Sequence, residues 1–136
     1  MPRVYLDSCI VIYLVQAPDP IRDAVRQALD PPGGPAPQVC ISALTRLECR
    51  VWPLREDATE LLAEFDRFFA SRELRRARLT GAVFDLATEL RARYGVKTPD
   101  ALHLAAAITW DCDEFWTNDQ RLPRAIEERI AVRVLP

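Results

Sequence analysis

The stretch Val4-Tyr5-Leu6-Asp7-Ser8-Cys9-Ile10-Val11-Ile12-Tyr13-Leu14-Val15 decides the fold. Its first three residues are apolar and stop at an aspartate, a pattern typical of a short buried strand. From Cys9 to Val15 every residue is apolar, which suits a buried helix entered from Ser8. A buried strand followed at once by a buried helix is the opening unit of an α/β protein.

The rest of the chain repeats this alternation. Short, largely apolar runs predict further strands at residues 39–41, 114–117 and 131–135. Alternating polar and apolar residues predict a short edge strand at 76–79. Apolar residues at helical spacing predict helices at residues 19–29, 42–52, 57–72, 81–94, 99–110 and 120–130. Pro53 is expected to end the 42–52 helix, and the Pro- and Gly-rich segment 31–37 is expected to be a loop. This alternation predicts a parallel sheet with helices on both faces.

Composition limits the class of protein. With 136 residues, 49% of them hydrophobic, the chain is expected to form one domain over residues 1–136. The net charge of -2 does not suggest a nucleic-acid binder, but it does not show where the charges lie. The four cysteines form no C-x-x-C pair, which disfavours a zinc site. We find no secretory signal and no apolar run long enough to span a bilayer, so we expect a reduced, cytoplasmic protein without membrane association.

Three acidic residues fall where parallel α/β sheets bind ligands, at the carboxyl ends of strands. Asp7 follows the first strand, and Asp119 follows the strand predicted at 114–117. Asp100 lies in the first turn of the helix predicted at 99–110. Each has a simpler explanation, because Asp7 and Asp119 could cap helices and Asp100 could complement a helix dipole.

Glu48 is harder to explain as a surface residue. The apolar face of its predicted helix is defined by Leu44, Leu47 and Val51. Glu48 lies on that same face, and a carboxylate directed into the core is costly unless it is compensated. The alternative is a pair with Arg46 or Arg50, but both arginines point off the apolar face.

Together these residues predict a metal site. Four carboxylates that converge repel one another, and a divalent cation is the natural compensation. Ligands that are all oxygen suit Mg²⁺ or Mn²⁺, and metal held by carboxylates is a common means of cutting phosphodiesters. Ser8, Thr117 and Asn118 are expected to orient the carboxylates or metal-bound water.

Four blocks of the sequence resemble the signatures of the PIN domain, and more narrowly the VapC toxins of type II toxin–antitoxin pairs. The blocks are Tyr5–Ile10, Ser42–Glu48, Lys97–Ala107 and Phe115–Asp119. The resemblance covers the whole chain in order, and the last two blocks are the most specific. The one departure is Cys9, where such proteins often carry asparagine or another polar residue.

The resemblance implies a fold, an activity and partners. The fold is a doubly wound, mostly parallel five-stranded sheet in the order 3-2-1-4-5. The activity is a Mg²⁺-dependent endoribonuclease, with metal or catalytic roles for Asp7, Glu48, Asp100 and Asp119. The partners are RNA, a second copy in a homodimer, and a VapB-like antitoxin that covers the acidic pockets, alone or in a hetero-oligomer. We expect Asp7, Asp100 and Asp119 to hold Mg²⁺, with or without Glu48.

Five further residues carry weaker predictions. RNA-backbone contacts are predicted for Arg46, Arg50, Arg121 and Arg124, which lie near the candidate acids in sequence. His103 follows Asp100 by three residues and could donate to a site carboxylate, but we favour a core histidine satisfied by its neighbours.

Two alternative functions stay open. One is a PIN nuclease that processes RNA without an antitoxin, which the sequence does not distinguish from a toxin. The other is a receiver-like signalling module, which shares the length and the acidic pocket. A receiver would need an aspartate at the end of the third strand, where this chain has Leu79 and Thr80. The RNA substrate is not predicted.

Overall fold

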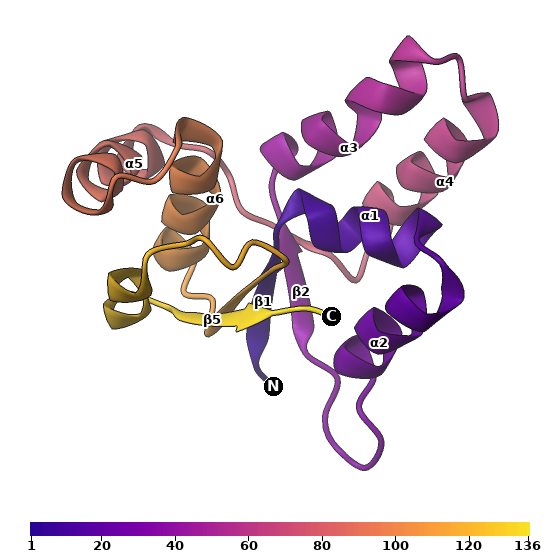
Figure 1. The fold of residues 1–136 in the computed structure, drawn as a ribbon, viewed down its shortest axis with the longest axis horizontal. Helices are drawn as coiled ribbons and strands as arrows, with labels where there is room; N and C mark the ends of the chain where they lie inside the picture. Colours follow the sequence, from indigo (N-terminus) through magenta and orange to yellow (C-terminus); the bar gives the residue numbers. More distant parts are fainter.

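The computed structural model describes residues 1–136 as an α/β fold with a five-stranded sheet (Figure 1). The strand order is β3-β2-β1-β4-β5, and every pairing is parallel, which confirms the predicted doubly wound sheet. The strands are β1 (Arg3–Leu6), β2 (Gln38–Ile41), β3 (Arg75–Arg76), β4 (Glu114–Thr117) and β5 (Ala131–Val134). The helices are α1 (Ser8–Gln16), α2 (Asp19–Leu29), α3 (Ala43–Arg55), α4 (Thr59–Phe69), α5 (Gly81–Tyr94), α6 (Thr98–Thr109) and the 3₁₀ helix η1 (Arg124–Glu128).

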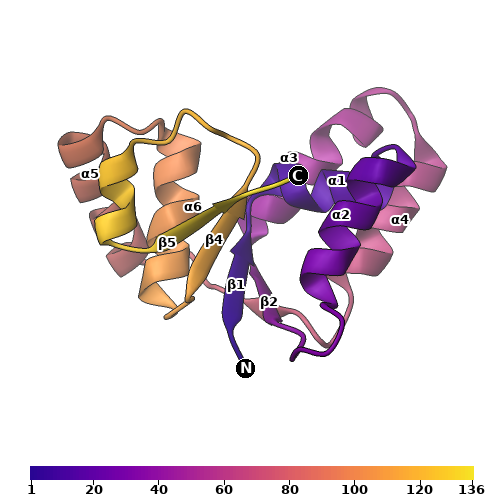
Figure 2. The same ribbon diagram turned by 60° about the horizontal axis from the view of Figure 1, so that its bottom comes forward.

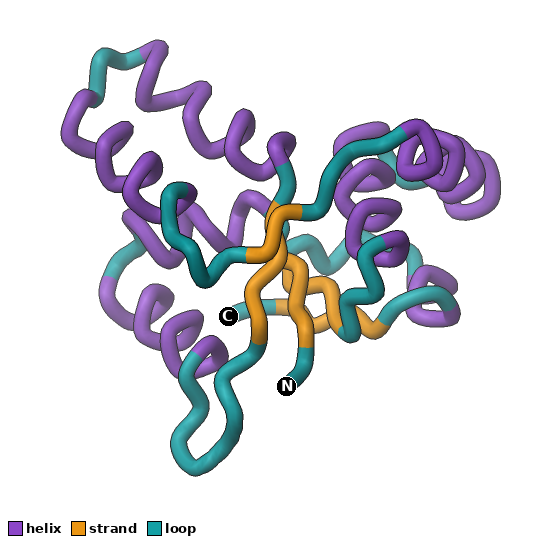
Figure 3. Tube along the Cα trace, turned by 180° about the vertical axis from the view of Figure 1, so that it is seen from behind, coloured by secondary structure: helices purple, strands orange, loops and turns teal.

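Successive residues of the central strands face opposite sides of the sheet and build two separate cores. In β1, Tyr5 packs with α5 and α6, whereas Val4 and Leu6 pack with α1, α2 and α4. In β4, Phe115 packs in the core with α5 and α6, and Trp116 packs in the core with α1, α2 and α4. Figure 2 shows the result, with α5 and α6 on one side of the sheet and α1 to α4 on the other. The strands run between these two groups of helices, as the view from behind also shows (Figure 3).

Three predicted elements differ from the observed ones because tertiary contacts decided them. Helix α3 passes through Pro53 and ends at Arg55, since a proline in the last turn removes a single hydrogen bond and Pro53 is buried. The edge strand β3 has only two residues, at 75–76 rather than 76–79, because the chain leaves the sheet after Ala77 bonds to Ile41.

The helix predicted at 120–130 is wrong. Residues 120–121 form a turn, residue 122 a bend, and the five-residue 3₁₀ helix η1 begins after Pro123. Pro123 has no N–H to continue a helix, and the Asp119 side chain takes the N–H of Arg121 at 2.9 Å. None of the helices combines the length and the apolar composition that a bilayer crossing demands.

Candidate active site

A polar cavity of about 530 Å³ opens at the carboxyl ends of β1 and β4. It is lined by Asp7, Ser8, Cys9, Glu48, Asp100, Asn118, Asp119, Gln120 and Arg121. The four candidate acids therefore reach one cavity, although they come from β1, α3, α6 and the loop after β4. This edge is where open α/β sheets bind their ligands.

Asp7 is both a helix cap and a cavity residue. One carboxylate oxygen, Oδ1, accepts the backbone N–H of Ser8 at 2.8 Å and caps α1. The other, Oδ2, accepts the hydroxyl of Thr117 at 2.8 Å. A carboxylate has about four acceptor positions, so these two bonds leave it able to bind a cation in the cavity. The capping explanation is therefore right, and it does not exclude a site role.

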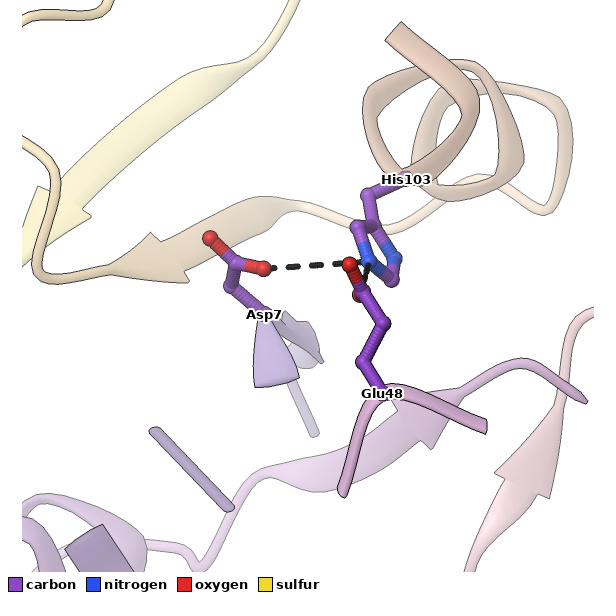
Figure 4. A group of neighbouring side chains, drawn as sticks. All are labelled: Asp7, Glu48 and His103. Atoms are coloured by element: carbon purple, nitrogen blue, oxygen red, sulfur yellow. Dashed lines mark hydrogen bonds and ion pairs between the residues drawn. The ribbon is translucent and has the colours of Figure 1, made fainter. Parts of the chain in front are cut away.

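Glu48 reaches the cavity for a different reason from the predicted one. The expected apolar face is wrong, because Leu47 and Val51 are 57% and 41% exposed. Helix α3 packs against α1 and α4 and buries Thr45, Cys49 and Pro53 instead. Glu48 lies at the edge of that buried face, and its side chain points to the ring of His103, with Asp7 beside them (Figure 4).

His103 is the site residue that the sequence prediction missed. Its ring is 1% exposed, and Nε2 lies 2.5 Å from Glu48 Oε1 and 3.8 Å from Asp7 Oδ1 (Figure 4). It is a buried and satisfied histidine, as expected, but its partner is a candidate site acid. The signal was its spacing, since residues three apart share a helix face and His103 follows Asp100 by three.

Asp100 and Asp119 have opposite electrostatic surroundings. Burial raises the pKa of Asp100, and the negative charges of Asp7 and Asp119 raise it further. The carboxylate of Asp119 accepts the backbone N–H of Arg121 at 2.9 Å and its guanidinium Nε–H at 3.1 Å. These bonds lower the pKa of Asp119. The cavity thus carries clustered negative charge, which Arg121 offsets at Asp119 and His103 offsets at Glu48.

Of the three predicted supporting residues, only Thr117 bonds to two of the acids through its side chain. Thr117 is fully buried, and its hydroxyl donates to Asp7 while accepting the N–H of Asp119 at 3.1 Å. Ser8 contributes its backbone N–H to Asp7, as described above. Asn118 lines the cavity, but its side-chain amide donates to the hydroxyl of Tyr13 at 2.8 Å. Thr117 is therefore the residue that ties two of the acids together.

The thiol of Cys9 in the cavity is poorly suited to act as a nucleophile. Burial, together with the charge of Asp7, raises the pKa of the Cys9 thiol to about 12. A thiol of this kind stays protonated at neutral pH, and the thiolate is the reactive form. Covalent chemistry through Cys9 is therefore disfavoured.

The four candidate arginines separate into two pairs. Arg46 and Arg50 both reach Asp66 of α4, at 3.8 and 2.9 Å, on the side of α3 away from the cavity. Arg121 lines the cavity and is 84% exposed beyond its bond to Asp119. Arg124 lines a neighbouring cavity of about 140 Å³ that shares Asp119. The structure therefore favours the second pair as contacts near the acids.

Comparison with known proteins assigns the family. The sequence pattern of the PIN domain matches residues 4–128. The chain belongs to the PIN domain family. No curated protein matches it at a significant level. Solved structures show that the fold of this PIN domain recurs in toxin–antitoxin complexes.

Three of these structures illustrate the likeness. A toxin–antitoxin complex from Klebsiella pneumoniae has 24% identity and a TM-score of 0.71, and the alignment covers 96% of each chain. VapBC2 from Rickettsia felis, bound to a promoter DNA fragment, has 15% identity, a TM-score of 0.72 and coverage of 98% and 99%. Mycobacterium tuberculosis VapC20, a toxin that cleaves the sarcin–ricin loop, has 16% identity, a TM-score of 0.72 and the same coverage.

The donor set fits a hard divalent cation. Carboxylate oxygens of Asp7 and Glu48 lie within 4.8 Å of each other, beside the ring of His103, and Asp100 and Asp119 line the same cavity outside this close group. Carboxylate oxygens are the ligands of Mg²⁺ and Mn²⁺, whereas a zinc site would favour cysteine and histidine. The raised pKa of Asp100 indicates negative charge that a cation would stabilise.

Proposed function

We propose that this PIN domain is a Mg²⁺-dependent endoribonuclease and the toxin of a VapBC-type toxin–antitoxin pair. Mn²⁺ is the expected substitute for Mg²⁺. The observation that carries the proposal is the meeting of Asp7, Glu48, Asp100 and Asp119 in one polar cavity. Without a cation these carboxylates would repel the phosphates of RNA. A divalent cation held among them would attract a phosphate and so allow RNA to bind.

The residues would divide the work of hydrolysis. A bound Mg²⁺ would supply an activated water and neutralise charge on the phosphate. Asp7, Asp100 and Asp119 would hold the cation, with Glu48 able to join them or to orient the attacking water together with Asp119. Thr117 would keep Asp7 in place through its hydroxyl. Arg121 and Arg124 would contact phosphates of the RNA that flank the cleaved bond.

A protein partner is supported by two apolar areas on the surface. Helix α3 exposes Leu47, Val51 and Leu54 at helical spacing, with 41 to 57% of each residue accessible. A separate apolar cavity of about 480 Å³ lies between α5 and α6, beside the half-exposed Phe84. Exposed patches of this kind mark interaction surfaces. Two such areas suit a protein that forms a homodimer and also binds a VapB-like antitoxin in the cytoplasm.

Two measurements test the proposal. The purified protein should cleave RNA with Mg²⁺ or Mn²⁺ and lose this activity in EDTA. Co-expression with the product of an adjacent short gene should yield a complex in which cleavage is suppressed. RNA cleavage without any such complex would favour a PIN nuclease in RNA processing, and the absence of metal-dependent cleavage would reject the nuclease itself.

A further inference from the structure

A buried polar network lies behind the candidate acids. The hydroxyl of Tyr5, a fully buried residue of β1, donates to Ser42 Oγ at 2.8 Å and lies 3.3 Å from Thr45 Oγ1. The same hydroxyl lies 2.7 Å from His103 Nδ1. The opposite ring nitrogen of His103, Nε2, lies 2.5 Å from Glu48. The network therefore runs from the core of the sheet into the cavity.

The contacts form a closed ring across three elements. Thr45 and Glu48 are three residues apart on α3 and lie on neighbouring positions of one face. Tyr5 reaches Thr45 from β1, and His103 reaches Glu48 from α6. Because Tyr5 and His103 also contact each other, the ring closes and ties α3 to α6 beneath the cavity.

From this geometry we propose that His103 is a positioning residue that holds the Glu48 carboxylate beside Asp7, and that Tyr5 fixes the orientation of the His103 ring. The inference rests on the proposed function, since it concerns how the cation site is assembled. The ionised carboxylate can only accept, so His103 Nε2–H donates to Glu48. The single hydroxyl proton of Tyr5 goes to Ser42, so the Tyr5 oxygen accepts from His103 Nδ1–H.

The need for such a residue follows from the surroundings of Glu48. Its side chain is 30% exposed, and the neighbouring residue Leu47 is 57% exposed. A long side chain at the edge of an open cavity has several rotamers, and most of them would carry its carboxylate away from Asp7. His103 has no such freedom, because its ring is buried and held at both nitrogens. Buried groups that bind metal ligands are known to set metal affinity in this way.

The hydroxyl of Tyr5 is suited to its part. The whole residue is buried, and its hydroxyl is held by Ser42 at 2.8 Å. Its ring also stacks on Phe115 at 5.7 Å between centroids, which limits its movement. The anchor of His103 is therefore itself fixed by the core.

The test is the affinity of the full-length protein for Mn²⁺, measured by electron paramagnetic resonance without RNA. Replacing a group that orients a metal ligand typically weakens metal affinity about 10- to 100-fold, so we expect at least a tenfold loss for His103→Leu. His103→Gln retains an N–H donor of similar reach and should recover most of the affinity. Tyr5→Phe removes only the hydroxyl and should give a smaller loss, about threefold, within the range of one lost hydrogen bond. It also tests the network if His103→Leu does not fold.

Two controls separate positioning from stability. Leu104→Ala alters a fully buried neighbour on α6, so it should lower the melting temperature while leaving Mn²⁺ affinity unchanged. In a Glu48→Gln background, His103→Leu should cause no further loss, because a residue that acts through Glu48 has nothing left to position.

Several results would overturn the inference. These are unchanged affinity in both His103→Leu and Tyr5→Phe, additive losses with Glu48→Gln, or ¹⁴N coupling to the bound Mn²⁺, which would make His103 a metal ligand. Wild-type protein that binds no Mn²⁺ would overturn it together with the proposed metal site. Protein that binds Mn²⁺ with the expected variant pattern but cleaves no RNA would reject the proposed function alone.

Discussion

The helical side of the cavity, formed by α6, and its loop side, formed by residues 117–121, hold the same kind of side chain in opposite surroundings. Asp100 on α6 is desolvated and faces other carboxylates, which raises its pKa. Asp119 on the loop receives two bonds from Arg121, which lower its pKa. On the loop side a guanidinium bonds directly to the acid, whereas on the helical side the charge of His103 lowers the pKa of Asp100 less than burial and the neighbouring carboxylates raise it.

The difference between Asp119 and Asp100 follows from the backbone that carries each of them. A short loop satisfies its carboxylate locally, through a residue two positions away. Asp100 lies in the first turn of α6, where N–H groups are free, but its carboxylate bonds to none of them and must find a partner elsewhere. For Asp100 we expect that partner to be the metal ion.

The largest expected effect comes from Asp7, where the two sides meet. Asp7→Asn should reduce RNA cleavage with Mg²⁺ by about 10²- to 10³-fold, because it removes a charge worth several kcal/mol to cation binding. The fold should persist, since asparagine also caps helices well. Cleavage assays and circular dichroism measure both properties. A normal cleavage rate in folded Asp7→Asn protein would reject its assignment to the site.

A bound cation should give Asp100 the positively charged partner that Asp119 already has in Arg121. At a free Mg²⁺ or Mn²⁺ concentration of 100 times Kd, we expect the free energy of unfolding to rise by about 2.7 kcal/mol. The gain should shrink in Asp100→Asn protein and disappear in EDTA. Thermal unfolding over a metal titration measures it. An equal gain in Asp7→Asn protein would place the cation outside this cavity.

A smaller effect concerns the metal-free protein. The raised pKa of Asp100 means that its ionised form disfavours the folded state, so Asp100→Asn should stabilise the protein at pH 7. After allowance for solvent screening we expect on the order of 0.5 kcal/mol. The difference should shrink as the pH falls through the raised pKa and vanish below 3.8, the ordinary value. Urea unfolding at several pH values tests this, and destabilisation at pH 7 would contradict it.

The smallest effect lies on the loop side. The lowered pKa of Asp119 means that its charge stabilises the fold above the ordinary value of 3.8, and that this is lost as the pH falls through the lowered pKa. Arg121→Ala removes the guanidinium but keeps the backbone N–H bond, so it should lower stability at pH 7 by only about 0.3 kcal/mol. The matched variant Asp119→Asn should lose more than Arg121→Ala. The reverse order would show that the guanidinium, and not the backbone, holds Asp119.

Local patterns were sufficient where the responsible contacts are near in sequence. Helix α5 spans the predicted residues 81–94 because Thr80 caps its start and Gly95, at φ 70°, ends it. The positions of Asp7 and Asp119 followed from strands that stop at polar residues. The same reasoning placed the end of α3 too early, because a periodic pattern does not show that Pro53 is buried. It also predicted a helix at 120–130 that does not form, because the side-chain bond of Asp119 leaves no periodic pattern.

The sequence by itself determined the alternation of strands and helices, and hence the parallel sheet and the edge at which its acids gather. It did so because apolar periodicity and the ends of strands are properties of neighbouring residues. Only the tertiary structure decided which partners those acids have. His103 and Glu48 are 55 residues apart, and Tyr5 and His103 are 98 apart. Such contacts depend on how α3 and α6 pack against the sheet, and no spacing along the chain records that.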